Sequence, residues 1–250
     1  MIAATPPRNR PRPLLLALAL AAISGLASGG GSVVVAQEAT PGVLAEAPAA
    51  ISCGDAGTPG TPGASAATPA PAAETFTVVG ADSAARYRAQ EELAGRGANE
   101  AVGQTDAIIG AVLFDAAGKP MPCSRFAVDL RTLKSDEARR DNYLYKNTLE
   151  TEKYPLAVFI VTRVEGLATP LPDGKPLAFK MIGNLTMHGQ TKAVVWDATA
   201  MMKGDELTGS AHTTFTMDQF NIEPPTVGPV LSIDPTVQLE IDLTARKAAA

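Results

Sequence analysis

The side chains best suited to chemistry in this chain are its histidines, of which it has only His188 and His212. His188 falls in the predicted turn His188-Gly189-Gln190, and His212 falls on the polar side of a predicted strand. Neither has neighbouring ligands at a spacing that holds a metal ion. We interpret both as turn or surface residues, and we predict no metal site and no cofactor.

The sequence also lacks the short motifs that carry common catalytic sites. It contains no G-x-S-x-G elbow, no Walker loop, no strand followed by G-x-G-x-x-G and no C-x-x-C pair. Most carboxylates fall on the outward side of predicted strands. We predict no catalytic residue and interpret the chain as a non-enzyme. An enzyme with titratable groups converging near His188 is the weaker alternative.

Two cysteines, Cys53 and Cys123, are present. An exported protein can form a disulfide between them, which would pin the N-terminal segment to the domain that follows. The alternative is two unrelated thiols, and the sequence leaves both open.

The N-terminal residues 1–36 have the pattern of an export signal. Arg8, Arg10 and Arg12 precede an apolar run at 14–22, and Val34-Val35-Ala36 offers small residues for cleavage. No charge interrupts residues 14–36, so a signal anchor is an alternative to a cleaved signal peptide. Either one predicts an exported protein, which is periplasmic, displayed at the cell surface or secreted, and membrane-anchored if the signal is retained.

Residues 37–73 are rich in Ala, Pro, Thr and Gly, and the first aromatic residue of the chain is Phe76. This composition predicts a disordered linker that tethers a single domain at 74–246.

The formal net charge is −5, and the rest of the chain is more negative without its three N-terminal arginines. An acidic domain without a basic stripe argues against nucleic acid as a partner.

Alternating apolar and polar residues dominate the domain. At 177–187, Phe179, Met181 and Leu185 share one parity, while Lys180 and Asn184 take the other. Such alternation predicts strands with one wet and one dry face. Nine strands are predicted, at 75–80, 83–91, 105–115, 124–133, 156–164, 177–187, 191–202, 206–217 and 230–244. One helix is predicted from Ser135 to about Thr148, with a solvated charged cluster at 136–141.

Strands of this kind can close around an apolar interior that holds a slender ligand. The candidate lining residues are the large apolar side chains of the inward parity, namely Phe126, Val128, Phe159, Phe179, Met181, Leu185, Trp196, Phe215, Leu239 and Ile241. The alternative is that the same residues fill a packed core, which would make the domain a structural or protein-interaction module.

Three motifs and their spacing resemble the YceI-like family over residues 76–245. They are Arg140-Asp141-x-x-Leu144 followed by Tyr154-Pro155, then Gly183-x-Leu185-Thr186-x-x-Gly189-x-Thr191-Lys192, then Asp218-x-Phe220-x-Ile222. The resemblance implies an all-β, lipocalin-like antiparallel barrel of about eight strands with one short helix. It also implies an isoprenoid or other long amphiphilic lipid as ligand, export to the periplasm, and a homodimer as one alternative.

The chain departs from that family in two places. Its early strand keeps Ser83, Ala85 and Tyr87 where the family often has a His-Ser pair. The connection from Leu93 to Gln104 contains three glycines and is interpreted as a long, flexible loop. Both departures fall where the mouth of a barrel is expected, so they concern the ligand more than the fold.

Overall fold

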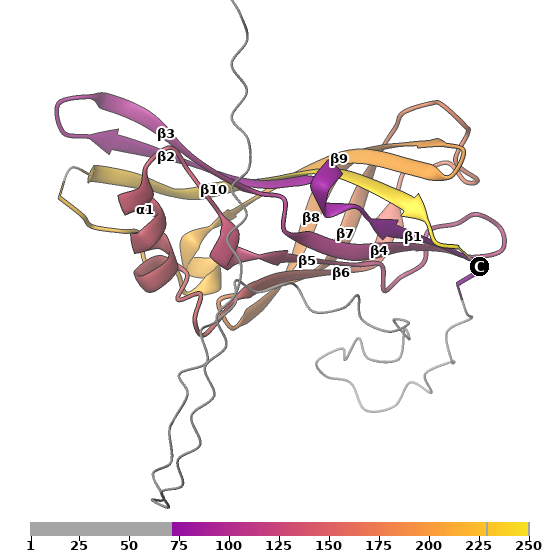
Figure 1. Ribbon diagram of the computed structural model, residues 1–250, viewed down its shortest axis with the longest axis horizontal. Helices are drawn as coiled ribbons and strands as arrows, with labels where there is room; N and C mark the ends of the chain where they lie inside the picture. Colours follow the sequence, from indigo (N-terminus) through magenta and orange to yellow (C-terminus); the bar gives the residue numbers. More distant parts are fainter. Residues whose placement is uncertain (1–71, 229, 250) are drawn as a thin grey trace, which may run out of the picture. The chain divides into compact units, whose positions relative to one another are not determined.

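The computed structural model describes residues 72–228 and 230–249 of this chain (Figure 1). The predicted signal segment, nearly all of the predicted linker, and Cys53 lie outside these residues. The described part contains one α-helix, α1 (Ala138–Tyr143), and ten strands. The strands are β1 (Glu74–Val78), β2 (Ala84–Leu93), β3 (Gly97–Thr105), β4 (Ile108–Phe114), β5 (Arg125–Asp129), β6 (Leu156–Glu165), β7 (Leu177–Met187), β8 (Gln190–Lys203), β9 (Glu206–Thr216) and β10 (Val230–Lys247).

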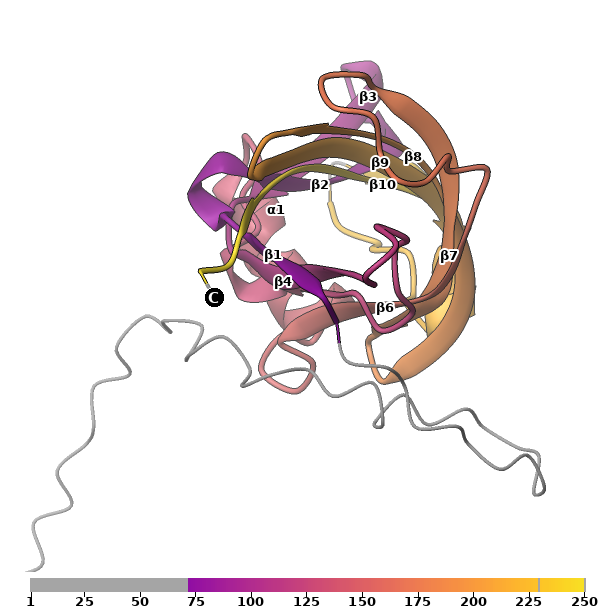
Figure 2. The same ribbon diagram turned by 90° about the vertical axis from the view of Figure 1, so that its right-hand side faces the viewer.

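Eight of the strands close into an antiparallel barrel. The order around the ring is β1-β4-β5-β6-β7-β8-β9-β10, and β10 returns to pair with β1, with Val78 opposite Ala245. Figure 2 looks into this ring. Closure removes the unpaired edges that an open sheet would expose. The predicted fold class, an eight-stranded antiparallel barrel with one short helix, is confirmed.

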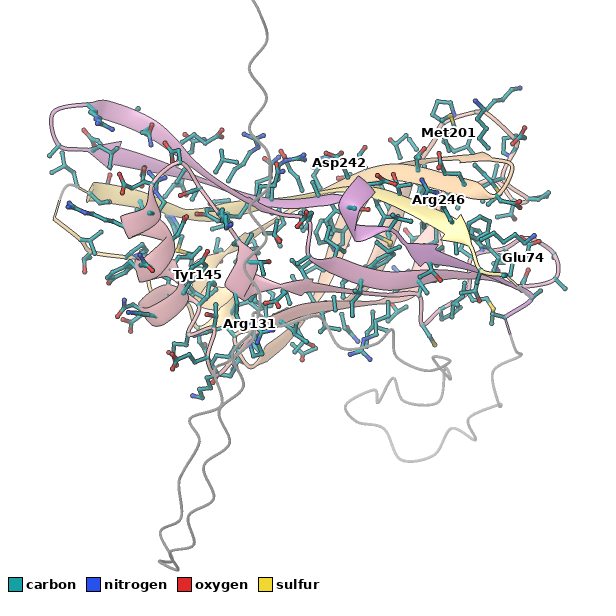
Figure 3. All side chains as sticks on the ribbon, viewed as in Figure 1. Glu74, Arg131, Tyr145, Met201, Asp242 and Arg246 are labelled. Atoms are coloured by element: carbon teal, nitrogen blue, oxygen red, sulfur yellow. The ribbon has the colours of Figure 1, made fainter. Side chains whose placement is uncertain are left out.

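Strand β10 is long because it pairs with two different strands along the same edge. Its last residues pair with β1, whereas Val230–Asp242 pair with β2. The β2–β3 hairpin therefore continues the sheet beyond the ring, and α1 lies against this extension (Figure 1). The two ends of the domain differ accordingly. Figure 3 places Tyr145 with the helix, and Glu74 and Arg246 at the opposite end.

The prediction of a flexible loop at 93–104 is wrong, because this segment is the turn and second strand of a hairpin. β3 pairs with β2 over its full length, from Gly97 opposite Leu93 to Thr105 opposite Ala85. Gly95 and Gly97 both have φ of 77°, which a tight turn requires and which side chains disfavour. Gly103 lies beneath the ring of Tyr87, where an added Cβ would come within 2.1 Å of Cε1. The glycines thus mark a turn and a close approach.

Other predicted boundaries also shift. The strand predicted at 105–115 is broken after Thr105, so that β3 ends and β4 begins at Ile108. The strand predicted at 124–133 ends at Asp129, whose carboxylate accepts a hydrogen bond from the backbone N–H of Arg131 and begins a 3-10 helix. The predicted helix is α1 followed by a π-helical turn at Leu144–Thr148.

The alternation predicted for the last strand holds only in part. Val237 is buried, but Leu231 is 64% exposed although it shares the same parity. The register of β10 against β2 shifts twice upstream of Val237, so parity does not carry through that stretch. On β7 the alternation is as predicted, with Leu185 and Met187 buried and Thr186 exposed between them.

Within the described residues, no helix has both the length and the hydropathy needed to cross a membrane.

Candidate ligand-binding cavities

Two cavities lie along the inside of the sheet and share no lining residue. The small cavity has a volume of about 100 Å³ and lies within the ring of β4 to β10. Its wall is aromatic and aliphatic, and its few polar contributors are small side chains such as Ser124 and Thr199. Across this wall the rings of Phe159 and Trp196 lie 5.8 Å apart, centroid to centroid.

The large cavity has a volume of about 650 Å³ and lies between the β2–β3 hairpin, α1 and the start of β10. This volume is in the range of sites that hold drug-sized ligands. Most of its wall is apolar, and the apolar residues are Ala89, Leu93, Ala94, Ala101, Leu130, Leu133, Leu144, Leu149, Met187, Phe215, Met217, Ile222, Pro225, Val227, Val230, Ile233, Val237 and Leu239.

Eight of the ten candidate lining residues line one of these two cavities. Six line the small cavity, namely Phe126, Phe159, Phe179, Met181, Trp196 and Ile241. Phe215 and Leu239 line the large cavity. Val128 and Leu185 line neither, because Leu185 is a buried residue of the core cluster and Val128 packs against that cluster. Contact of any of the ten with a ligand stays a prediction.

Sequence reasoning missed most of the large cavity. Part of its wall comes from β3, which the sequence analysis interprets as a loop, and from residues such as Leu130, Ile222 and Val227, whose segments lack period-two alternation. One signal for a strand was available, because Ala101, Gly103 and Thr105 fall on alternate positions and all three are buried in β3. The glycines at 95, 97 and 103 obscured it.

A polar network occupies one side of the large cavity. The carboxylate of Glu91 on β2 has only 4% of its side-chain surface exposed. Its Oε1 accepts hydrogen bonds from Nη2 of Arg140 at 2.8 Å and from Nδ2 of Asn99 at 2.7 Å. The other terminal nitrogen of Arg140, Nη1, is 2.5 Å from Asp136. The network therefore joins α1 to both strands of the hairpin.

The predicted solvated charge cluster at 136–141 is only partly correct. Asp136 is exposed, as a solvated cluster requires, and it pairs with Arg140 four residues further along the chain. Asp141, by contrast, is buried and accepts hydrogen bonds from the backbone N–H of Ser135 and from its hydroxyl, the latter at 2.6 Å. Asp141 therefore fixes the segment that leads into the helix.

Tyr87 contributes a phenol to the wall of the large cavity. Burial raises the pKa of its hydroxyl to about 12, with Arg140 opposing and Asp141 and Glu91 adding to the shift. The phenol is therefore neutral at physiological pH.

Among the described residues, buried side-chain atoms without a hydrogen-bond partner include the hydroxyls of Tyr87 and Thr148, Nε2 of His188 and Nε1 of Trp196.

His188 lies in the predicted turn but is not a surface residue, since only 10% of its side chain is exposed. Its Nδ1 is 3.0 Å from the backbone oxygen of Phe220, and its ring lies edge-on to Tyr154 at 4.9 Å. Gly189 beside it is also in contact with the Tyr154 ring, where a Cβ would come within 2.9 Å. The three motifs of the sequence resemblance therefore meet here. His212 is exposed on β9, as predicted.

Two further predictions concern metals and thiols. Among residues 72–228 and 230–249, no three His, Cys, Asp or Glu side chains gather in a way that could hold a metal ion. Cys123 is buried after β4, and its predicted partner Cys53 lies outside the described residues, so the disulfide stays a prediction.

A closed lipocalin-like barrel with apolar cavities is the class of protein that this fold and site define. A family model for the YceI-like domain matches residues 76–245, and the chain belongs to that family. A UPF0312 protein of Pseudomonas putida strain GB-1 is 34% identical over 125 residues, covering 46% of this chain and 60% of that protein. A UPF0312 protein of Pseudomonas fluorescens strain SBW25 is 34% identical over 147 residues, covering 55% and 69%. The chain thus spans 60% or less of the first curated relatives that it matches.

Two solved structures share the fold. One is a polyisoprenoid-binding domain from Saccharophagus degradans implicated in plant cell wall breakdown, with a TM-score of 0.55, 12% identity, and coverage of 69% of this chain and 98% of that one. The other is Burkholderia cenocepacia BcnA, with a TM-score of 0.53, 18% identity, and coverage of 67% and 99%. At these identities the likeness concerns the fold alone.

Proposed function

We propose that this domain binds an isoprenoid or another long amphiphilic lipid in its large apolar cavity. The observation that carries the proposal is the large cavity, which has a volume of about 650 Å³ and a mainly aliphatic and aromatic wall. The description of the Saccharophagus degradans domain as polyisoprenoid-binding supports the same ligand class.

The energetics suit such a ligand. Each buried CH₂ is worth about 0.8 kcal/mol, so ten methylenes would contribute about 8 kcal/mol before the costs of ordering the chain. Few polar contacts are then needed for tight binding, and selectivity among tails of similar length would be low. Met187 in the wall suits a variable tail, because methionine adapts its shape easily.

The same cavity distinguishes this proposal from a packed structural module. A barrel that served only as an interaction scaffold would be filled by its own side chains. We also favour binding over catalysis, because the buried carboxylate beside the large cavity, that of Glu91, is already paired with Arg140.

Native mass spectrometry tests the proposal. The full chain, expressed in a lipid-containing host and purified without detergent, should carry a co-purifying lipid or should take up an added C20 isoprenoid at one copy per protein. Absence of both adducts, from a protein shown to be folded by circular dichroism, would count decisively against lipid binding.

Export is a separate proposal, supported by the basic and apolar pattern of residues 1–36. Cell fractionation with intact-mass measurement tests it. A secreted or periplasmic protein that has lost about 36 residues supports a cleaved signal, a membrane-bound protein of full mass supports an anchor, and a cytosolic protein of full mass contradicts both.

A further inference from the structure

Glu91 places a buried carboxylate in a cavity whose other walls are mainly apolar. Such a group is costly to bury unless its charge is paired and its lone pairs are satisfied. The two oxygens of this carboxylate differ in their hydrogen bonds. Oε1 accepts from both Arg140 and Asn99, whereas Oε2 accepts no hydrogen bond from the described residues and keeps some accessible surface, which leaves it open to a ligand.

The cations near this carboxylate do not offer a buried site for an anion. Arg140 already pairs with both Glu91 and Asp136, so the three groups together carry one negative charge. Two other arginines of the wall, Arg96 and Arg139, are exposed to solvent. Ion pairs with exposed arginines are weak, because water and salt screen them.

We propose that the polar end of the ligand is an uncharged hydrogen-bond donor, such as the hydroxyl of an isoprenoid alcohol, which donates to Oε2 of Glu91. This inference rests on the proposed lipid-binding function. The donated hydrogen bond supplies the acceptor with the partner that the protein does not provide, while the tail lies against the apolar wall that includes Met187, Phe215 and Leu239. A carboxylate or diphosphate head would instead meet like charge.

The proposal separates ligands that differ only at the head. An isoprenoid alcohol and its methyl ether have nearly the same tail, but only the alcohol can donate. Because a hydrogen bond to a charged group is stronger than a neutral one, the alcohol should bind about tenfold or more tightly than the ether. The diphosphate of the same isoprenoid should bind more weakly than the alcohol.

Isothermal titration of the full chain with geranylgeraniol, its methyl ether and its diphosphate tests this order. The variant Glu91→Gln keeps an oxygen for Arg140 and Asn99 but removes the negative charge and the free acceptor. It should bind the alcohol about tenfold less tightly, leave ether binding unchanged and improve diphosphate binding. Glu92→Gln, on the neighbouring exposed residue, should match the wild-type protein for all three ligands.

Three results would overturn the inference. Equal binding of alcohol and ether by the wild-type protein excludes a donated hydrogen bond, and this comparison does not depend on any variant. Tightest binding of the diphosphate indicates an anion site at the exposed arginines. An equal loss of all three ligands in Glu91→Gln indicates that Glu91 only holds α1 in place. If the wild-type protein binds none of the three, the proposed function fails together with this inference.

Discussion

Arg140 of α1 donates to Glu91 of β2 at 2.8 Å, across 49 residues of sequence. Among the contacts of the helix, this one connects it directly to the hairpin that extends beyond the closed ring. The large cavity lies between these two elements, and both residues of the pair line it. The same carboxylate is thus both a structural contact and the proposed head-group acceptor.

Replacing Arg140 by alanine should destabilise the domain strongly. Glu91 would keep its buried charge but lose its ionic partner, which costs about 3 kcal/mol, or a fall of about 10 °C in the midpoint of thermal unfolding for a domain of this size. Differential scanning fluorimetry measures the shift. Arg139→Ala is the matched control, because Arg139 is an exposed neighbour on the same helix. Equal shifts in the two variants would contradict the structural role of the pair.

The volume of the large cavity can be reduced without changing its polar groups. Ala101 on β3 is buried and lines the cavity, so Ala101→Phe should fill part of it and lower binding of a C20 isoprenoid alcohol at least tenfold. Ala98→Phe, on an exposed position of the same strand, should bind as the wild-type protein does. Titration calorimetry on both variants measures the difference. Unchanged binding by Ala101→Phe would place the ligand elsewhere.

Gly103 should not tolerate a side chain while Tyr87 is present. An added Cβ would overlap the ring of Tyr87, so Gly103→Ala should destabilise the domain by about 1–3 kcal/mol. In a Tyr87→Leu background the same change should cost much less, because the ring that causes the overlap has been removed. Urea unfolding of the four proteins gives the coupling energy. A cost that is the same in both backgrounds would mean that the close approach does not limit this position.

Asp129 should make stability depend on pH. Its side chain is buried, which by itself would raise its pKa, but hydrogen bonds from the side chain and backbone N–H of Arg131 outweigh burial and lower the pKa below the ordinary value. A lowered pKa in the folded state contributes stability above the unfolded-state pKa of about 3.9 and loses it as the pH falls through the folded value.

Asp129→Asn should therefore lower the free energy of unfolding at pH 7, and the difference from the wild-type protein should shrink below about pH 4. Urea unfolding at pH 7 and pH 3 measures it. Asp205→Asn, an exposed aspartate in the turn after β8, should show little difference at either pH. A deficit for Asp129→Asn that is as large at pH 3 as at pH 7 would refute a contribution from the ionised carboxylate.

The barrel was predictable because its strands obey a simple rule. On β7 and β8, the residues of one parity are more buried than those of the other. The connection between these strands is so short that they must pair as antiparallel neighbours. The rule fails where the register shifts, as it does near Leu231. It also fails where a strand contains glycine to make room for a neighbouring aromatic ring, as Gly103 does for the ring of Tyr87.

The site was harder to predict than the fold for a related reason. Phe159 and Trp196 are buried beside the small cavity, but a parity pattern does not tell a filled interior from an open one. The large cavity exists because β2, β3 and α1 extend past the ring, and that arrangement depends on contacts between Glu91, Asn99 and Arg140 that are distant in sequence.

The measurement that most directly tests ligand binding in the large cavity is photo-crosslinking with a C20 isoprenoid alcohol that carries a diazirine in its tail, followed by peptide mass spectrometry. Our account predicts crosslinks to wall residues such as Met187, Phe215 and Leu239, and their loss when excess unlabelled alcohol is added. Crosslinks confined to exposed apolar residues such as Val195 and Leu231, or no crosslink that the unlabelled alcohol can compete away, would contradict it.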